Sequence, residues 1–312
     1  MSEQTDSGEH SFRREDVSFQ SVGERVEGVL YLPERIANPP VVVLAGGWCY
    51  VKELVQPFYA EAFAKLGLAA LVFDYRRLGT SGGEPRQHLD PNDQMEDYRN
   101  AISYLETRSD VDALRLGVWG ISYSGGHVLI LGATDPRVKA IVSVVPVVDG
   151  LTTLQMAHGT MGMRRLRDRI AESRRKLFET GEHSFIPHAS EDPISNVVTW
   201  PFPASEPLFA WLKETQGPNY ENRATVASTE MLLGYSVYPH VTRLIDTPTM
   251  VVVAEGDDHT MWNLEIEAFH AIPTPKKRLE VISKSGHHGL YRDEERIRAV
   301  ALECGSWFRQ WL

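Results

Sequence analysis

A serine in this chain lies in the sequence context of an enzymatic nucleophile. Residues 116–126 (LGVWGISYSGG) run from an apolar stretch into a turn of small residues, and a helical pattern follows. Small neighbours let a strand and the next helix approach closely, which strains the turn and exposes a serine hydroxyl at the helix N-terminus. Backbone N–H groups and the helix dipole favour negative charge there. The pattern predicts Ser122 as the nucleophile, with Ser124 as a rival whose hydroxyl the helical register should bury.

Partners for such a serine occur later in the chain. A serine hydroxyl is a poor nucleophile near neutral pH, so it needs a histidine base, which an acid must orient. Asp257 and Asp258 follow the apolar run 247–255, and one of the two is expected to be a turn or helix-capping residue. His287 and His288 lie between glycines in a later loop, which suits the presentation of an imidazole.

The surrounding elements alternate between strand and helix. Short apolar runs rich in β-branched residues occur at 41–45, 69–75, 114–119, 140–148 and 247–255. Such runs suit strands buried on both faces. Helical patterns occupy 55–66 and 92–107, and a last helix begins near Asp293. The alternation predicts an α/β fold with a doubly wound, mostly parallel sheet.

The N-terminal part departs from this alternation. The first dozen residues are polar and predict a disordered lead-in. Residues 16–21 and 25–32 are β-rich and are joined by a short turn. They predict an antiparallel hairpin at the sheet edge.

A long segment between two predicted strands lacks strong strand signals. Residues 149–243 exceed an ordinary loop, so they predict an inserted, mostly helical cap on a core of residues 1–148 and 244–312. The basic segment 163–178 is expected to expose its charges, with contact to an anionic substrate as the alternative. Four aromatic residues are expected either to line a pocket or to serve in cap–core packing or a dimer interface: Trp200, Phe202, Phe209 and Trp211.

Taken together, these motifs resemble the α/β-hydrolase superfamily over nearly all of the chain beyond Phe12. The likeness is to the branch that holds dienelactone-hydrolase-related enzymes, X-prolyl-peptidase-like esterases and fungal polyketide transferases. It is carried by residues 41–53 (VVVLAGGWCYVKE), 73–86 (FDYRRLGTSGGEPR), 120–126 (GISYSGG) and 254–260 (AEGDDHT).

The resemblance implies roles for individual residues. In this fold the chain order is nucleophile, acid, base. The family pattern matches Asp257 as the acid, with Asp258 as a near alternative and Asp149 as a more distant one. The family pattern G-H-x-x-x-Y matches His287 and Tyr291, which favours His287 over His288 as the base.

The oxyanion hole of this fold consists of two backbone N–H groups. One should belong to Tyr123, directly after the nucleophile. The other should belong to the loop after the first parallel strand, where Trp48 follows two glycines. Gly46 stands where the family often has histidine.

Composition excludes several other classes of protein. The formal net charge of −10 argues against nucleic acid or an anionic membrane as the main partner. No apolar run approaches the roughly 18 residues that a membrane span requires. With two cysteines, Cys49 and Cys304, no disulfide framework is implied, and a cytoplasmic protein with free thiols is expected. No motif supports a cofactor, and no ligand spacing supports a metal.

The expected activity is hydrolysis of an ester or thioester of a small molecule through an acyl-enzyme. Acyl transfer to another acceptor is the alternative implied by the polyketide transferases. The same triad also serves carbon–carbon bond hydrolases, and a ligand-binding protein on this scaffold is the non-catalytic alternative. A homodimer is a further possibility.

Overall fold

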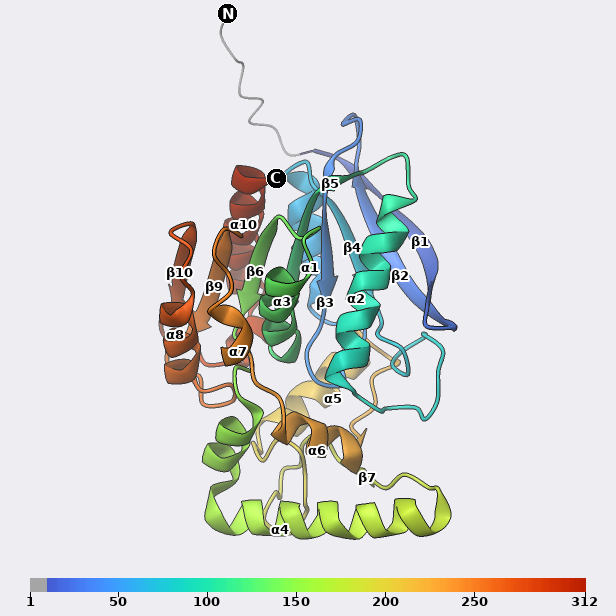
Figure 1. Cartoon of the computed structure of the whole chain (residues 1–312), viewed down its shortest axis with the longest axis vertical. Coiled ribbons are helices and arrows are strands. Elements are labelled where there is room, and N and C mark those ends of the chain that lie inside the picture. Colours follow the sequence, from blue (N-terminus) through green and yellow to red (C-terminus); the bar gives the residue numbers. More distant parts are fainter. Residues whose placement is uncertain (1–9) are drawn as a thin grey trace, which may run out of the picture.

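The computed structural model describes residues 10–312, which form one large sheet with helices on both faces (Figure 1). The strands of this sheet are β1 (Phe12–Ser21), β2 (Glu24–Pro33), β3 (Pro40–Ala45), β4 (Ala69–Phe73), β5 (Asp112–Ile121), β6 (Ala140–Val144), β9 (Thr249–Ala254) and β10 (Lys277–Ile282). Their order is β1-β2-β4-β3-β5-β6-β9-β10. β2 pairs antiparallel with β1 and β4, whereas every pairing from β4 to β10 is parallel. The predicted fold class and the edge hairpin are therefore confirmed.

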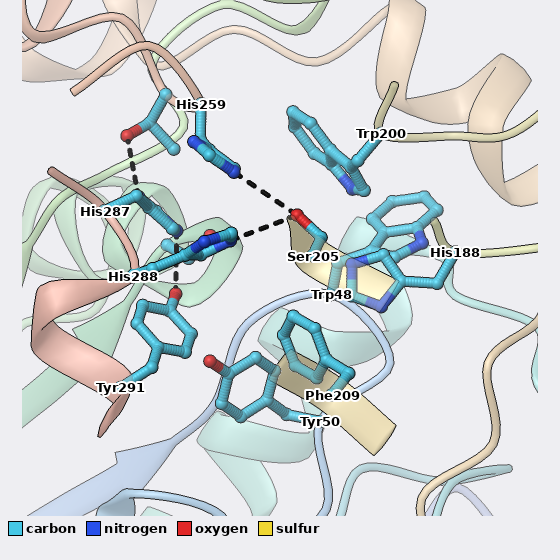
Figure 2. Close-up of a pocket in the computed structure, with 12 residues that line it drawn as sticks. Trp48, Tyr50, His188, Trp200, Ser205, Phe209, His259, His287, His288 and Tyr291 are labelled. Atoms are coloured by element: carbon cyan, nitrogen blue, oxygen red, sulfur yellow. Dashed lines mark hydrogen bonds between the residues drawn. The ribbon is translucent and has the colours of Figure 1, made fainter. Parts of the chain in front are cut away.

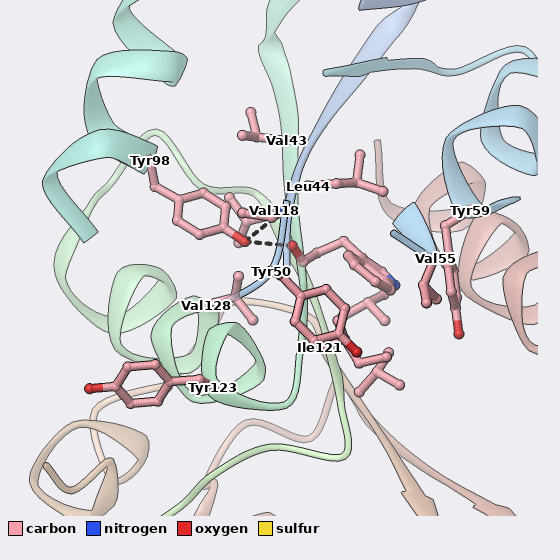
Figure 3. Packing of buried hydrophobic residues seen from close by; sticks show 14 of the residues in the cluster. Val43, Leu44, Tyr50, Val55, Tyr59, Tyr98, Val118, Ile121, Tyr123 and Val128 are labelled. Atoms are coloured by element: carbon pink, nitrogen blue, oxygen red, sulfur yellow. Dashed lines mark hydrogen bonds between the residues drawn. The ribbon is translucent and has the colours of Figure 1, made fainter. Parts of the chain in front are cut away.

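Helices cover both faces of the sheet, which explains the continuous apolar runs in its strands. They are α1 (Gln56–Lys65), α2 (Pro91–Glu106), α3 (Tyr123–Thr134), α8 (Trp262–Ala271), α9 (Gly289–Arg292) and α10 (Glu294–Trp311). Figure 3 shows Tyr98 of α2 and Val128 of α3 on one side of the central strands and Tyr59 of α1 on the other. All three side chains are buried.

Two details differ from the expectations. The strand predicted at 140–148 ends at Val144, because Val145 has a φ of 39° and Pro146 has no N–H to continue a ladder. The predicted lead-in is too long, since the His10 N–H donates to the Lys65 carbonyl and β1 begins at Phe12. The part of that lead-in before His10 lies outside the described residues.

The chain between β6 and β9 lies across the end of the sheet at which the parallel strands terminate (Figure 1). It contains α4 (Gly150–Thr180), β7 (Phe185–Ile186), α5 (Ser205–Thr215), β8 (Ala224–Thr225), α6 (Val226–Leu233) and α7 (Tyr238–Val241). The domain limits at 149 and 243 stay a prediction. Within α4, Leu166 and Ile170 are buried while most of the arginines between them and around them are exposed, as expected for a solvated basic face. No helix within residues 10–312 is both long enough and apolar enough to cross a membrane.

A buried ion pair ties the edge hairpin to the loop that follows β4. The Asp97 carboxylate, on α2, accepts hydrogen bonds from the Ser21 hydroxyl at 2.5 Å and from the Arg76 backbone N–H at 2.9 Å. The Arg76 Nε also donates to it at 2.5 Å, and Asp97 is 1% exposed. Three segments that are distant in sequence therefore meet at one carboxylate.

We expect Asp97→Ala to destabilise the protein by about 3 kcal/mol, because it removes the buried carboxylate bonded to Arg76 and leaves that guanidinium with the longer ion pair to Asp93, at 3.5 Å. Urea unfolding monitored by circular dichroism measures this change. Glu96→Ala is the matched control on the same helix, since Glu96 pairs with Arg99 at the surface and its loss should cost below about 1 kcal/mol. Equal losses for the two variants would contradict the interpretation.

Candidate active site

The sharp turn between β5 and α3 holds Ser122 in a strained backbone conformation. Its φ is 58° and its ψ is −116°, outside the regions that a non-glycine residue usually adopts. Its N–H donates to the Val144 carbonyl at 2.9 Å, and its own carbonyl accepts from the Val147 N–H at 3.0 Å. A Cβ on Gly120 would lie 2.2 Å from the Ser124 carbonyl oxygen, so glycine is required for this close approach. Contacts on both sides of the turn thus maintain the strain.

The rival serine is turned away from the surface of the site. Ser124 is fully buried, and its hydroxyl forms hydrogen bonds with the Tyr75 hydroxyl at 2.5 Å and with the Gly46 carbonyl. The helical register predicted this burial. Ser124 therefore connects α3 to the loop after β3, whereas Ser122 lines a pocket.

Asp257 follows β9 and accepts a hydrogen bond from His287 Nδ1 at 2.7 Å. Three more donors reach the same carboxylate, which is completely buried: the backbone N–H groups of His259 and Thr260 and the Thr260 hydroxyl. Burial alone would raise the pKa of Asp257, but the His287 charge and these hydrogen bonds outweigh it and lower the pKa to about 2. Asp257 is therefore ionised at neutral pH.

The other two acid candidates lie in different environments. Asp258 has a side chain that is 76% exposed, and it accepts from His259 Nδ1 at 2.9 Å. Asp149 caps α4 by accepting from the Thr152 N–H at 2.9 Å. Neither alternative is hydrogen-bonded to His287 in the described part of the chain.

A second carboxyl group near Asp257 escaped the sequence reasoning. Glu265 is fully buried, and its Oε1 lies 2.7 Å from the hydroxyl of Thr260, which also contacts Asp257. Burial and the neighbouring Asp257 charge raise the pKa of Glu265 well above its ordinary value. Glu265 reaches Thr260 and not the imidazole, so Asp257 is the carboxylate that bonds directly to His287. No spacing in the sequence distinguishes Glu265 from the other acidic residues of its helix.

His287 and Ser122 line the same pocket, but the structure does not join them by a hydrogen bond within residues 10–312. In the neutral form of His287, Nδ1–H donates to Asp257 and the lone pair lies on Nε2. That lone pair accepts the Tyr291 hydroxyl at 2.8 Å (Figure 2). The partner of the imidazole in this structure is thus Tyr291, a residue that sequence reasoning used only as part of a family pattern.

The two predicted oxyanion donors lie beside Ser122. The Tyr123 N–H is the first of α3, so no carbonyl of a preceding helical turn can accept its hydrogen bond. The Trp48 N–H also has no acceptor among the described residues. A Cβ on Gly47 would lie 2.9 Å from the Ser122 Cβ, so this loop packs directly against the serine. Asp74 holds the far end of the loop by accepting from the Lys52 N–H at 2.6 Å.

The pocket is narrow, with a cavity volume of about 30 Å³, and Figure 2 draws the side chains around it. Its lining residues come from both the sheet edge and the segment between β6 and β9; they are Trp48, Tyr50, Ser122, His188, Trp200, Ser205, Phe209, His259, Thr260, His287, His288 and Tyr291. Of the four aromatic residues predicted at a pocket, Trp200 and Phe209 line this one. Phe202 stacks on His259 at 3.8 Å, and Trp211 lines a neighbouring pocket that shares His288.

Most of the polar residues of the pocket were not predicted. The sequence analysis assigned no role to His188, His259 or Ser205. It favoured His287 over His288 as the base. The position of His259 two residues after Asp257 was a usable signal, because both follow the same strand. His188 and Ser205 lie in a stretch without periodicity, where no signal was available. Burial lowers the pKa of His188 and His288 to about 3, so both are neutral at pH 7.

The site's acidic and histidine groups favour proton transfer over metal binding. Asp257, Asp258 and His259 offer ligand atoms within 4.8 Å of one another. Those atoms are already engaged, because Asp257 bonds to His287 and Asp258 bonds to His259. Cys49 is buried in the loop beside Trp48, and burial raises the pKa of its thiol, which keeps it protonated.

The doubly wound sheet with a serine-bearing elbow at its carboxyl edge defines an α/β hydrolase, a class of enzymes. Within this class, the chain belongs to the X-Pro dipeptidyl-peptidase (S15) family, whose model matches residues 23–289. This confirms the resemblance drawn from the motifs.

Individual relatives cover most of the chain. The thiohydrolase aneE of Aspergillus aculeatus is 32% identical over 88% of this chain and 86% of its own length. The quorum-quenching protein AidA of Acinetobacter baumannii is 30% identical over 91% of each chain. The solved structure of the α/β hydrolase GrgF from Penicillium sp. superposes with a TM-score of 0.79 at 23% identity, covering 96% of this chain and 99% of that one.

The low pKa of Asp257 predicts a pH dependence of folding. A carboxyl whose pKa falls from about 4 in the unfolded chain to about 2 in the native protein stabilises the native state above pH 5. This contribution, about 2 kcal/mol, is lost as the pH falls toward 2. Asp257→Asn should therefore show a flatter decline of unfolding free energy between pH 5 and pH 3, measured by urea titration. Retention of the wild-type slope would contradict the ionised Asp257.

Proposed function

We propose that the protein is a serine hydrolase that cleaves an ester or thioester through an acyl-enzyme on Ser122. The observation that carries the proposal is the buried Asp257–His287 pair, which shares one pocket with the strained Ser122. These groups supply the nucleophile, the base and the orienting acid that acyl transfer requires.

The reaction begins when Ser122 Oγ attacks the carbonyl carbon and its proton passes to His287 Nε2. The N–H groups of Trp48 and Tyr123 stabilise the oxyanion, and removal of one such donor typically costs about 3 kcal/mol of barrier. His287 then protonates the leaving alcohol or thiol. A water molecule, deprotonated by the same imidazole, releases the acid and restores Ser122.

This cycle requires His287 Nε2 to change its partner. In the structure the lone pair of Nε2 accepts the Tyr291 hydroxyl, so it is unavailable to Ser122 until that bond is released. Catalytic hydrogen bonds are often long or absent before substrate binds, and they form in the complex. We infer that substrate entry shifts the imidazole from Tyr291 to Ser122.

The pocket supports a neutral acyl group as the substrate. Within the described residues its lining holds no lysine, arginine, aspartate or glutamate, and burial keeps His188 and His288 uncharged. The Trp48 and Trp200 indole N–H groups and the Tyr50 hydroxyl are buried there without protein partners, which suits acceptor oxygens on a substrate. An ester or thioester is favoured over a peptide with a free amino end, because that ammonium would find no counter-charge.

Acyl transfer is the second candidate. The chain segment between β6 and β9 contributes Trp200, Ser205 and Phe209 to the pocket, and Ser122 is 8% exposed. Such cover can exclude water and favour another acceptor. The curated relatives include a polyketide transferase, grgF of Penicillium sp., as well as thiohydrolases. Two other activities were also expected from the sequence, namely carbon–carbon bond hydrolysis by the same residues and ligand binding without catalysis. No contact among the described residues favours either of them over ester or thioester hydrolysis.

We also propose a cytoplasmic location, in keeping with the two free cysteines. A small-molecule substrate is proposed in place of nucleic acid or membrane, which the acidic net charge of −10 supports. A homodimer stays a prediction.

The nucleophile is tested by two serine variants. Ser122→Ala should lower kcat/KM toward a p-nitrophenyl ester by at least about a thousandfold and abolish the acyl-enzyme seen by intact-protein mass spectrometry. Ser124→Ala is the control: it removes a buried hydrogen bond but leaves the acyl-enzyme. An acyl group retained in the first variant and lost in the second would reverse the assignment.

The exchange of partners at His287 is tested with Tyr291→Phe. Because the phenol does not itself transfer the proton in this scheme, we expect kcat/KM to stay within about tenfold of wild type, whereas His287→Ala should approach the loss seen for Ser122→Ala. Tyr59→Phe is the matched control, since its hydroxyl is also buried but lies on α1, outside the lining of the pocket. A loss with Tyr291→Phe as large as with His287→Ala would show that Tyr291 relays the proton.

A further inference from the structure

A second serine in the pocket is bonded to histidines. Ser205, the first residue of α5, is 2% exposed. Its Oγ lies 3.0 Å from His288 Nε2 and 3.3 Å from His259 Nε2 (Figure 2). His259 Nδ1 in turn lies 2.9 Å from the Asp258 carboxylate. Serine, imidazole and carboxylate are thus connected in the order that activates a nucleophile.

The proton positions in this cluster follow from its charges. The hydrogen bond from His259 lowers the pKa of Asp258, and burial lowers the pKa of His259, so the pair consists of a carboxylate and a neutral imidazole near pH 7. The single proton of His259 therefore lies on Nδ1 and donates to Asp258. Nε2 keeps its lone pair and accepts the Ser205 hydroxyl proton.

His288 then completes the hydrogen bonding of Ser205. The hydroxyl has one proton, already given to His259, so His288 must donate Nε2–H to Ser205 Oγ. Burial keeps this imidazole neutral, with a pKa of about 3. Ser205 thus donates its proton to His259 on one side and accepts an N–H from His288 on the other, which fixes the orientation of its hydroxyl.

The cluster is held rigidly beside the first site. The His259 ring stacks on the His287 ring at 5.0 Å with an interplanar angle of 7°, and Phe202 covers its other face at 3.8 Å. The same pocket that holds Ser122 also holds Ser205, His259 and His288. The two serines therefore line the same cavity.

We propose that Ser205 is a second nucleophilic serine, with His259 as its general base and Asp258 as the residue that positions that base. With an activated ester, Ser205 Oγ bonds to the carbonyl carbon, the bond to the leaving alkoxide breaks, and His259 passes the serine proton to that alkoxide. With a fluorophosphonate, an Oγ–P bond forms, the P–F bond breaks, fluoride leaves and the proton passes through His259 to solvent. Neither step uses Ser122, so the proposal stands apart from the proposed function.

The experiment labels Ser122→Ala protein with a small alkyl fluorophosphonate and maps the modified peptide by mass spectrometry. We expect one adduct on Ser205, formed at least about tenfold faster than any adduct on the Ser122→Ala/Ser205→Ala double variant. His259→Gln in the Ser122→Ala background should slow labelling about a hundredfold, because it removes the base.

Ser190→Ala in the same background is the matched control. Ser190 is also a buried serine of the segment between β6 and β9, but its hydroxyl accepts from the Asp192 N–H and the Asn196 side chain and contacts no histidine. This variant should label like its parent. Circular dichroism identifies any variant that fails to fold. If one does, the labelling of Ser205 in the Ser122→Ala protein is by itself the test of the proposal. Unmodified Ser205 in folded Ser122→Ala protein would overturn the proposal, whereas an unlabelled Ser122 in wild type would overturn the proposed function instead.

Discussion

The site depends on the close approach of α3 to the strands behind it. That approach holds Ser122 at a φ of 58°, and the contacts of its N–H and carbonyl with the end of β6 and the loop beyond it keep it there. A strained backbone conformation persists where several contacts with the surrounding structure hold it in place. From this turn follow the exposure of the Ser122 hydroxyl to the pocket, the free N–H of Tyr123 and the burial of Ser124. A relaxed turn would separate the hydroxyl from the N–H groups of Trp48 and Tyr123, which we propose as the oxyanion donors.

The electrostatic character of the pocket depends on which carboxyl and imidazole groups around it carry protons. Asp257 carries a buried negative charge that four hydrogen bonds satisfy, and burial and that same charge raise the pKa of Glu265 beside it. His188 and His288 on the walls are neutral because burial disfavours their charged forms and lowers the pKa of each to about 3. The result is a polar pocket without a free charge, in which imidazole lone pairs and N–H groups are the reactive features.

The segment between β6 and β9 changes an open sheet edge into an enclosed pocket. It places Trp200 and Phe209 opposite Trp48 and Tyr50, and the aromatic contact between Tyr50 and Phe209 links the core to that segment. It also brings Ser205 to the histidines of the core loops. One pocket therefore contains two serine hydroxyls in different settings, one on the strained turn and one on the covering helix.

The sequence determined the sheet, its edge hairpin and the elbow, because apolar runs and small-residue turns act over short distances along the chain. It also ranked Ser122 over Ser124, since helical register is a local property. Motif likeness selected Asp257 and His287, and the tertiary structure placed them 2.7 Å apart. Only the tertiary structure decided that Tyr291 holds His287 Nε2, that Glu265 lies beside Asp257 and that Ser205 meets His259 and His288. Those contacts join segments that have no characteristic spacing along the sequence. The burial that sets the protonation of the residues involved arises from the packing of the whole fold.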